Sequence, residues 1–275
     1  MQNPIPCQKL VYCVAALCCV ILSASAQSRP PAADAVQSGL EKEYASLLDF
    51  YKDLHLHPEL SLHEERTSAH VAEELKKAGY EVTTKVGGHG VVAFLRNGAG
   101  RTVLVRTDMD ALPVKEQTGL PYASSVTSKD ARGNDVPVMH ACGHDMNMTC
   151  VIGAARQLAQ VKDRWHGTLV VIGQPAEETG QGARAMLADG LFSRFPRPDF
   201  CLALHDDAEL AAGTVGYTPG FTYANVDMVD ITIHGIGGHM LEPKADPGRP
   251  AESRKGIRAM WRKRGNGDGG SKITL

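Results

Sequence analysis

Residues 102–110, with the sequence TVLVRTDMD, decide the fold of this chain. The segment Thr102–Arg106 is rich in β-branched and apolar residues, which predicts a buried strand. Two carboxylates follow this strand directly, at Asp108 and Asp110. Because open α/β sheets place their ligand sites outside the carboxyl ends of their strands, the segment predicts both a sheet and one edge of a site.

Two more predicted strands end in the same way. Thr168–Ile172 runs into the carboxylate pair Glu177-Glu178, and Phe200–Leu204 ends at His205. A random scatter of surface charges would not follow strand ends. We therefore expect these side chains to meet at one edge of the sheet.

The densest set of potential ligands is the heptad MHACGHD at residues 139–145, which holds a thiol, two imidazoles and a carboxylate. Mixed Cys, His and Glu sets suit a transition metal such as zinc or manganese. Alone, the heptad is equally typical of a loop with a buried Cys and capping histidines. Together with Glu178 and His205 it favours a metal site. In the Glu177-Glu178 pair one residue can bind metal while the other moves protons, although such pairs are also common in acidic turns.

The rest of the chain alternates between helical and extended patterns. Apolar spacing predicts helices at Val36–Leu56, Glu64–Ala78, Asn147–Ala159 and Ala183–Ala188, and further strands at Tyr80–Thr84 and Val91–Leu95. Alternation of this kind predicts the α/β class, with a three-layer α/β/α catalytic domain whose mainly parallel sheet is covered on both faces.

Length and charge limit the possible partners. The chain has 275 residues and a formal net charge of −2, which gives no basic field for nucleic acid, so no nucleic-acid partner is expected. The length allows one sizeable α/β domain and part of another.

The first residues have the pattern of a secretory signal. An apolar run from Leu10 to Leu22 follows Lys9 and precedes the small residues of Ala24-Ser25-Ala26. A signal peptide at 1–26, cleaved before Gln27 and followed by a linker at 27–35, predicts a periplasmic or secreted protein without a stable membrane anchor. The alternative is a membrane anchor, for which the run is short.

The cysteines make no disulfide framework. Four of the seven lie in the leader and would be removed with it, which leaves Cys142, Cys150 and Cys201. Cys142 is the candidate metal ligand, and the apolar surroundings of Cys150 and Cys201 predict core positions.

Four motifs, in this order along the chain, resemble those of a known enzyme family. They are HLHPELS at 55–61, RTDMDALP at 106–113, the heptad at 139–145 and PAEE at 175–178. Together they resemble the N-acyl-amino-acid amidohydrolases, which include hippurate hydrolases and plant indole-acetyl-amino-acid hydrolases. These enzymes belong to the wider group of di-metal peptidases that contains aminoacylase and carboxypeptidase G. The resemblance extends from about residue 40 to residue 239.

The resemblance implies a role for each matching residue. Glu177 falls on the catalytic glutamate that activates the attacking water, and Asp110 on the aspartate that steadies a ligand beneath the site. Asp108 stands where peptidase relatives carry a ligand histidine, so the resemblance does not support a ligand role for it. The implied cofactors are two divalent metal ions, from among Mn, Zn, Ni and Co. Their implied ligands are Cys142, His144, Glu178 and His205.

The resemblance fades toward the C-terminus. An incomplete catalytic domain is expected at 36–223, and the start of a smaller α+β lid or dimerisation domain at 224–240. His239 matches a histidine that, in relatives, reaches a neighbouring active site and stabilises the oxyanion. Residues 241–275 are rich in Pro, Gly, Arg and Lys and are expected to be disordered. The sequence is therefore interpreted as a truncated or frame-disrupted copy of a family whose members form homodimers.

Three functional hypotheses follow. The first is a metal-dependent amidohydrolase that hydrolyses the amide bond of N-acyl amino acids, including hippurate-like conjugates, with a metal-activated water. The second is a catalytically inactive remnant that still binds metal. The third is a structural zinc site in a non-enzymatic exported protein, which the free general base at Glu177 argues against.

Overall fold

The computed structural model describes residues 31–220, which form helices around one main sheet. The helices are α2 (Pro31–Leu56), α3 (Glu65–Lys77), α4 (His144–Gln160), the short 3-10 helix η1 (Lys162–Arg164), α5 (Gly182–Ala188) and α6 (Leu191–Arg194). The strands are β1 (Glu81–Val86), β2 (Gly90–Asn97), β3 (Thr102–Asp108), β4 (Thr127–Lys129), β5 (Asp135–Pro137), β6 (Gly167–Gln174) and β7 (Phe200–Ala203). Residues 212–220 are assigned to a second unit and contain no helix or strand.

The main sheet has the strand order β1-β2-β6-β3-β7. Strand β2 runs antiparallel to both of its neighbours, whereas β6, β3 and β7 are parallel to one another. Consequently β1, β6, β3 and β7 point the same way and only β2 opposes them. The sheet is mixed, as the expected α/β class allows.

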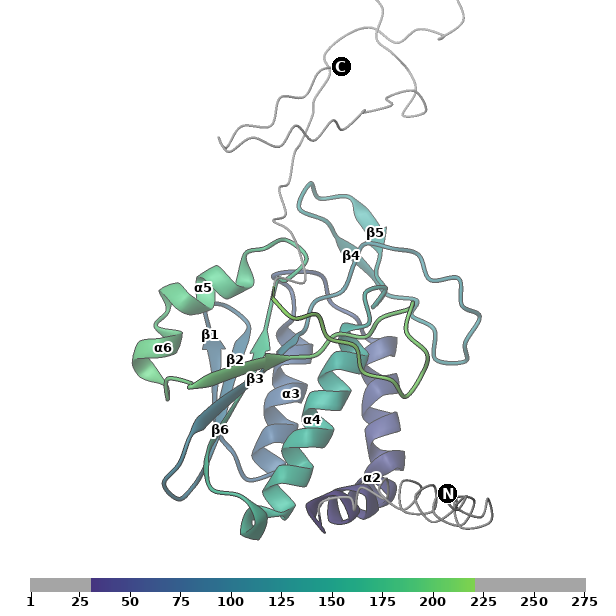
Figure 1. Cartoon of the computed structure of the whole chain (residues 1–275). Helices are drawn as coiled ribbons and strands as arrows, with labels where there is room; N and C mark the ends of the chain where they lie inside the picture. Colours follow the sequence, from purple (N-terminus) through teal and green to yellow (C-terminus); the bar gives the residue numbers. More distant parts are fainter. Residues whose placement is uncertain (1–30, 221–275) are drawn as a thin grey trace, which may run out of the picture. The chain divides into compact units, whose positions relative to one another are not determined.

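Both faces of the sheet are covered by helices. Helices α2, α3 and α4 lie on one side, and α5 and α6 on the other (Figure 1). Alternation along β2 explains this, because Val91 and Ala93 pack in the cluster with α3 and α4, while Val92 packs in the cluster that contains Met186 of α5. The three-layer α/β/α prediction is confirmed.

The sequence patterns located the main elements well. All the helices and strands expected within the described residues are present, and their ends differ from the predicted ends by a few residues. Helix α4 begins at His144, three residues before the predicted start at Asn147. The short elements α6, η1 and the three-residue strands β4 and β5 were not expected, because so few residues carry no readable periodicity.

The prediction of core positions for Cys150 and Cys201 is wrong. Both thiols are exposed. In the described sheet β7 is an edge strand that pairs with β3 alone, so apolar side chains such as Phe200 and Leu202 are more than half exposed, at 57% and 59%. Cys150 lies on the outward side of α4, although the neighbouring Val151 and Ile152 are buried.

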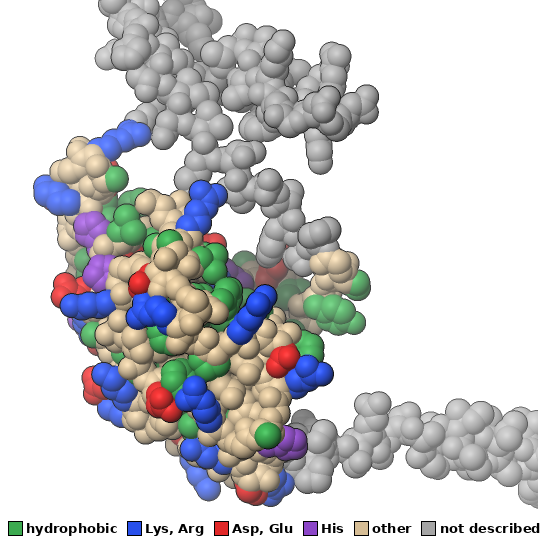
Figure 2. Space-filling model, turned by 90° about the vertical axis from the view of Figure 1, so that its left-hand side faces the viewer, with side chains coloured by type: hydrophobic (Ala, Val, Ile, Leu, Met, Phe, Trp, Pro, Cys, Tyr) green, Lys and Arg blue, Asp and Glu red, His purple; other side chains and the backbone are tan. Residues whose placement is uncertain are grey.

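On the face drawn in Figure 2, Lys and Arg side chains are interspersed with Asp and Glu. Across residues 31–220 no helix combines the length and the apolar character that a membrane crossing requires. The predictions for residues 1–30 and 221–275, among them the signal peptide, the lid strand and His239, lie outside the described residues.

A buried ionic network ties the end of α2 to the start of α4. The His55 ring donates from Nδ1 to Asp145 Oδ2 at 2.6 Å and from Nε2 to Glu116 Oε1 at 3.1 Å. The hydrogen bond to Asp145, followed by that to Glu116, outweighs burial and raises the pKa of His55 to about 9. The network therefore stabilises the fold while His55 carries its proton.

This network predicts a pH-dependent stability. The folded pKa of about 9 lies above the ordinary value of 6.5, so the stabilisation is complete below pH 6.5 and is lost as the pH rises through 9. We expect the free energy of unfolding of the metal-free protein to fall by on the order of 2–3 kcal/mol across that window. Denaturant titration would measure it. His55→Gln should make this fall smaller without abolishing it, because the pKa of His144 is also raised to about 9 in the metal-free protein. The exposed control His63→Gln should leave the fall unchanged. A flat wild-type profile would contradict the prediction.

Candidate metal centre

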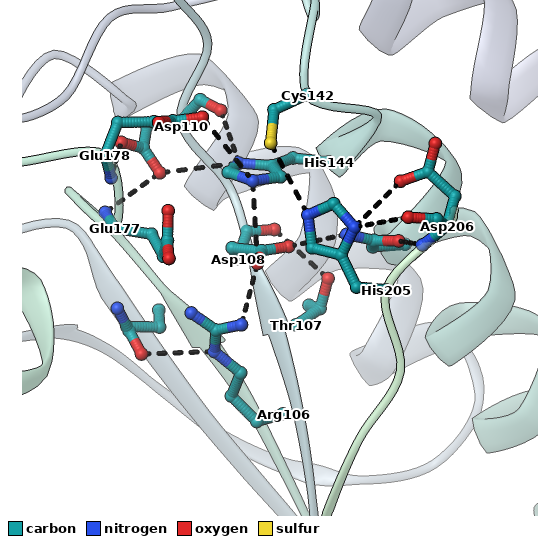
Figure 3. A network of polar contacts seen from close by, with 12 residues as sticks. Arg106, Thr107, Asp108, Asp110, Cys142, His144, Glu177, Glu178, His205 and Asp206 are labelled. Atoms are coloured by element: carbon teal, nitrogen blue, oxygen red, sulfur yellow. Dashed lines mark hydrogen bonds and ion pairs between the residues drawn. The ribbon is translucent and has the colours of Figure 1, made fainter. Parts of the chain in front are cut away.

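The strand ends meet where the sequence predicted. Strand β3 ends at Asp108, β6 ends three residues before Glu177, and β7 ends two residues before His205. Because β3, β6 and β7 are parallel, their carboxyl ends lie at the same edge of the sheet, and the N-terminus of α4 brings His144 to that edge. Figure 3 shows these side chains turned toward one another.

One group of potential ligands consists of Cys142, His144 and His205, whose ligand atoms lie within 4.8 Å of one another. His205 Nδ1 donates to the main-chain oxygen of Asp206 at 2.7 Å, which leaves Nε2 facing Cys142 Sγ at 3.5 Å. A sulfur and a nitrogen that bind one tetrahedral ion lie about 3.6 Å apart. The pair therefore fits a shared ion.

A second group shares His144 and adds Glu177 and Glu178. His144 Nδ1 donates to the main-chain oxygen of Asp110 at 2.7 Å, so its free Nε2 faces the centre. Both His144 Nε2 and Glu178 Oε1 are buried without a hydrogen-bond partner in the described structure, and they lie 3.8 Å apart. Buried polar atoms without a partner are costly, and a cation between these two would satisfy both.

The metal-free centre holds protons at its ligand atoms. Burial alone would lower the pKa of His144, but the hydrogen bond to Asp110 and the charge of Asp108 raise it to about 9. Burial, then the nearby charge of Glu178, raise the pKa of the Cys142 thiol to about 12. A metal binds thiolate and neutral imidazole, so binding must release these protons, and affinity should increase with pH.

Asp110 organises the centre from below. Its carboxylate is fully buried and accepts hydrogen bonds from the Glu177 and Glu178 amides, both at 3.0 Å, and from Ser61 Oγ at 2.6 Å. Burial would raise the pKa of Asp110, but its bonds with His144, Ser61 and the two amides hold the pKa below its ordinary value. The residue therefore steadies both the imidazole and the glutamate turn.

Glu177 has the electrostatics of a proton carrier. Burial, and then the charge of Glu178, raise the pKa of its carboxyl above the ordinary value. Its backbone amide is held by Asp110, while its carboxylate belongs to the second ligand group. A carboxylate with a raised pKa suits general acid–base work near neutral pH.

The Asp108 carboxylate accepts hydrogen bonds from two side chains outside the ligand groups. Its Oδ1 accepts from Asn147 Nδ2 at 3.0 Å and its Oδ2 from Arg106 Nη1 at 2.7 Å. Neither ligand group among the described residues contains it. Its Oδ2 also lies 3.6 Å from His144 Nε2, so the expectation that Asp108 does not replace the ligand histidine of peptidase relatives stays a prediction.

The sequence did not single out several residues that support the centre. Asn147 accepts from the Asp206 backbone amide at 3.0 Å while its amide group holds Asp108, so it joins two strand ends. Gly143 has φ +75°, and a Cβ there would lie 2.2 Å from the Asp206 carboxylate, so only glycine fits. Such contacts join residues distant in the chain. The sequence signal for Asn147 was its place one helical turn after His144.

The structure thus brings together six of the predicted site residues, namely Asp110, Cys142, His144, Glu177, Glu178 and His205. The seventh, His239, lies outside the described residues. His140, in the same heptad, is buried, and neither of its ring nitrogens has a hydrogen-bond partner among the described residues. Burial lowers the pKa of His140 to about 4. It therefore adds no charge beside the centre at neutral pH.

Comparison with known proteins places this geometry in a family. Residues 104–264 match the peptidase family M20/M25/M40. The chain is 36% identical over 207 residues to an N-acetyl-L-cysteine deacetylase of Bacillus subtilis strain 168, covering 75% of this chain and 46% of that protein. It is 37% identical over 194 residues to an N-acetyldiaminopimelate deacetylase of Oceanobacillus iheyensis, covering 70% and 49%.

A solved structure shares the fold. The YXEP protein of Bacillus subtilis, described as a dinuclear metal-binding peptidase of the M20 family, superimposes with a TM-score of 0.55 and 34% identity. The superposition covers 62% of this chain and 45% of that protein. This chain spans about half the length of the relatives it matches.

Proposed function

The chain belongs to peptidase family M20/M25/M40, and from this premise we propose that it carries the metal centre of an amidohydrolase that cleaves N-acyl amino acids. One observation supports the proposal above others. The Glu177 carboxylate, with its raised pKa, stands within 4.8 Å of ligand atoms of both His144 and Glu178. A structural metal site has no use for such a group.

Each residue of the centre has a proposed task. Cys142, His144, Glu178 and His205 would hold two divalent ions from among Mn, Zn, Ni and Co. When bound, the ions would polarise the amide carbonyl and lower the pKa of water. Glu177 takes a proton from the attacking water and returns it to the nitrogen of the leaving amine. Asp110 keeps Glu177 in place through the backbone amide.

The substrate class rests on relatives. Those described as deacetylases of N-acetyl-L-cysteine and N-acetyldiaminopimelate act on acylated amino acids by their names. We extend this class to the present chain, including hippurate-like conjugates. Export to the periplasm or outside the cell, from the signal pattern of residues 1–26, and a homodimer of the kind expected in relatives belong to the same proposal.

The proposal is tested by hydrolysis of a panel of benzoyl- and acetyl-amino acids. Metal-free protein should be inactive, and reloading with Mn²⁺ or Zn²⁺ should release free amino acid in proportion to the metal bound. Tight metal binding with no hydrolysis of any member would favour the inactive remnant. Equal hydrolysis with and without metal would refute a metal-dependent mechanism.

A further inference from the structure

The two central glutamates stand on a strained turn. Glu177 and Glu178 follow Ala176, a buried residue with φ +47° in the left-handed region. A side chain with a Cβ costs roughly 1–2 kcal/mol in that conformation, so the surrounding structure must hold it. The turn cannot relax by moving outward without displacing both carboxylates.

Two buried carboxylates supply that restraint. The backbone amides of three successive residues point into them. Ala176 N donates to Glu64 Oε1 at 2.7 Å, and the amides of Glu177 and Glu178 donate to the two oxygens of Asp110, each at 3.0 Å. Asp110 thus fixes the glutamates themselves, whereas Glu64 fixes the left-handed residue that precedes them.

The buried position of Glu64 is energetically unfavourable for a carboxyl group. Its side chain is fully buried, and Oε2 has no hydrogen-bond partner among the described residues. Its Oε1 accepts from two amides, that of Leu62 at 3.0 Å and that of Ala176. Burying a carboxyl group lowers the stability of the fold unless its hydrogen bonds offset the cost. One of these hydrogen bonds, to Ala176, joins residues 112 positions apart in the chain.

We infer that Glu64 is a positioning residue of the metal centre, which holds the turn at Ala176 and thereby aims Glu177 and Glu178 at the metal ions. It touches neither metal nor substrate and acts through the backbone. The part that concerns Glu177 rests on the proposed function. The part that concerns metal binding by Glu178 does not, and it can be tested without a substrate.

The competing explanation is that Glu64 only stabilises the start of α3 and the loop at Leu62. Two conservative variants separate the explanations. Glu64→Gln keeps an oxygen that can accept both amide bonds, and its NH2 group takes the place of Oε2, which has no partner. Glu64→Asp keeps the acid but is one methylene too short to reach Ala176. Positioning requires a side chain long enough to accept the hydrogen bond from the Ala176 amide. Glu64→Gln should therefore keep the turn in place, and Glu64→Asp should not.

The experiment measures Co²⁺ affinity by chelator competition, together with the Co²⁺ absorption spectrum and thermal unfolding. Loss of an outer partner of a metal ligand typically costs 10–100-fold in affinity. Glu64→Ala and Glu64→Asp should therefore weaken Co²⁺ binding by at least about tenfold and change the spectrum, whereas Glu64→Gln should bind like wild type. Where a substrate is hydrolysed, Glu64→Asp should lower kcat with little change in KM.

Glu74→Ala is the matched control. Glu74 is also buried, on α3, but it bonds Arg156 and Lys77 rather than the site. Its loss should lower thermal stability and leave Co²⁺ affinity unchanged. Wild-type affinity in Glu64→Asp, or equal losses in Glu64→Gln and Glu64→Asp, would overturn the inference. If Glu64→Ala does not fold, the Gln–Asp comparison still decides. Weak Co²⁺ binding in Glu64→Asp with no hydrolysis by wild type would refute the proposed function alone.

Discussion

Glu177→Gln should retain its metal and lose amide hydrolysis by a factor on the order of 10²–10⁴. The amide side chain keeps the size of the carboxylate, and the backbone bond to Asp110 does not involve it. What is lost is the group with the raised pKa that can take a proton from water. Steady-state kinetics and metal analysis of the same preparation would measure both effects.

The control for this variant is Glu81→Gln, whose side chain is 70% exposed on β1. It should hydrolyse as fast as wild type, which shows that loss of a carboxylate alone is harmless. If Glu177→Gln keeps most of its turnover, the proton carrier is another residue. If it loses metal as well, Glu177 is a ligand rather than the base.

His144→Ala should cause the largest loss of metal affinity of any single change. His144 is the one residue that belongs to both ligand groups in the described chain; its free nitrogen, Nε2, can bind one ion, so the change removes a direct and fully buried ligand. Its removal also leaves the Asp110 main-chain oxygen without its imidazole donor. We expect affinity for Co²⁺ to fall by more than about 100-fold, beyond the usual cost of losing an outer partner. Titration with Co²⁺ would measure it.

Cys142→Ala and Glu178→Ala provide the comparison, because each removes a ligand from one group only. Each should lose at least one ion. The sulfur-to-cobalt charge-transfer absorption should disappear in Cys142→Ala and persist in Glu178→Ala. Equal effects of all three variants would mean that the two groups are not distinct sites.

Much of the fold was readable from the sequence because the signals were local. Nearly continuous apolar runs at Val91–Leu95 and Thr168–Ile172 placed two central strands, and residues 102–110 placed the strand that leads to Asp108 and Asp110. The site was readable because ligand types followed strand ends, and parallel strands bring such ends together. The strand ends predicted where the site lies, and the resemblance carried by four ordered motifs implied the role of each residue.

The supporting contacts were not readable, because they depend on packing between distant segments. Glu64 looked like one acid among several at the start of a helix, and only the fold shows its bond to Ala176. The cysteine error has a related cause. An apolar neighbourhood predicts burial, but Cys150 faces outward on its helix and Cys201 lies on an edge strand.

The number of divalent ions bound per chain tests the central claim most directly. Metal-free wild type and His144→Ala would be dialysed to equilibrium against Zn²⁺ and analysed for metal. The two ligand groups predict two ions held saturably by wild type and the loss of at least one of them in His144→Ala, because the free nitrogen of His144, Nε2, can bind one ion. The same metal content in both proteins, or none in wild type, would contradict a metal centre at this edge of the sheet.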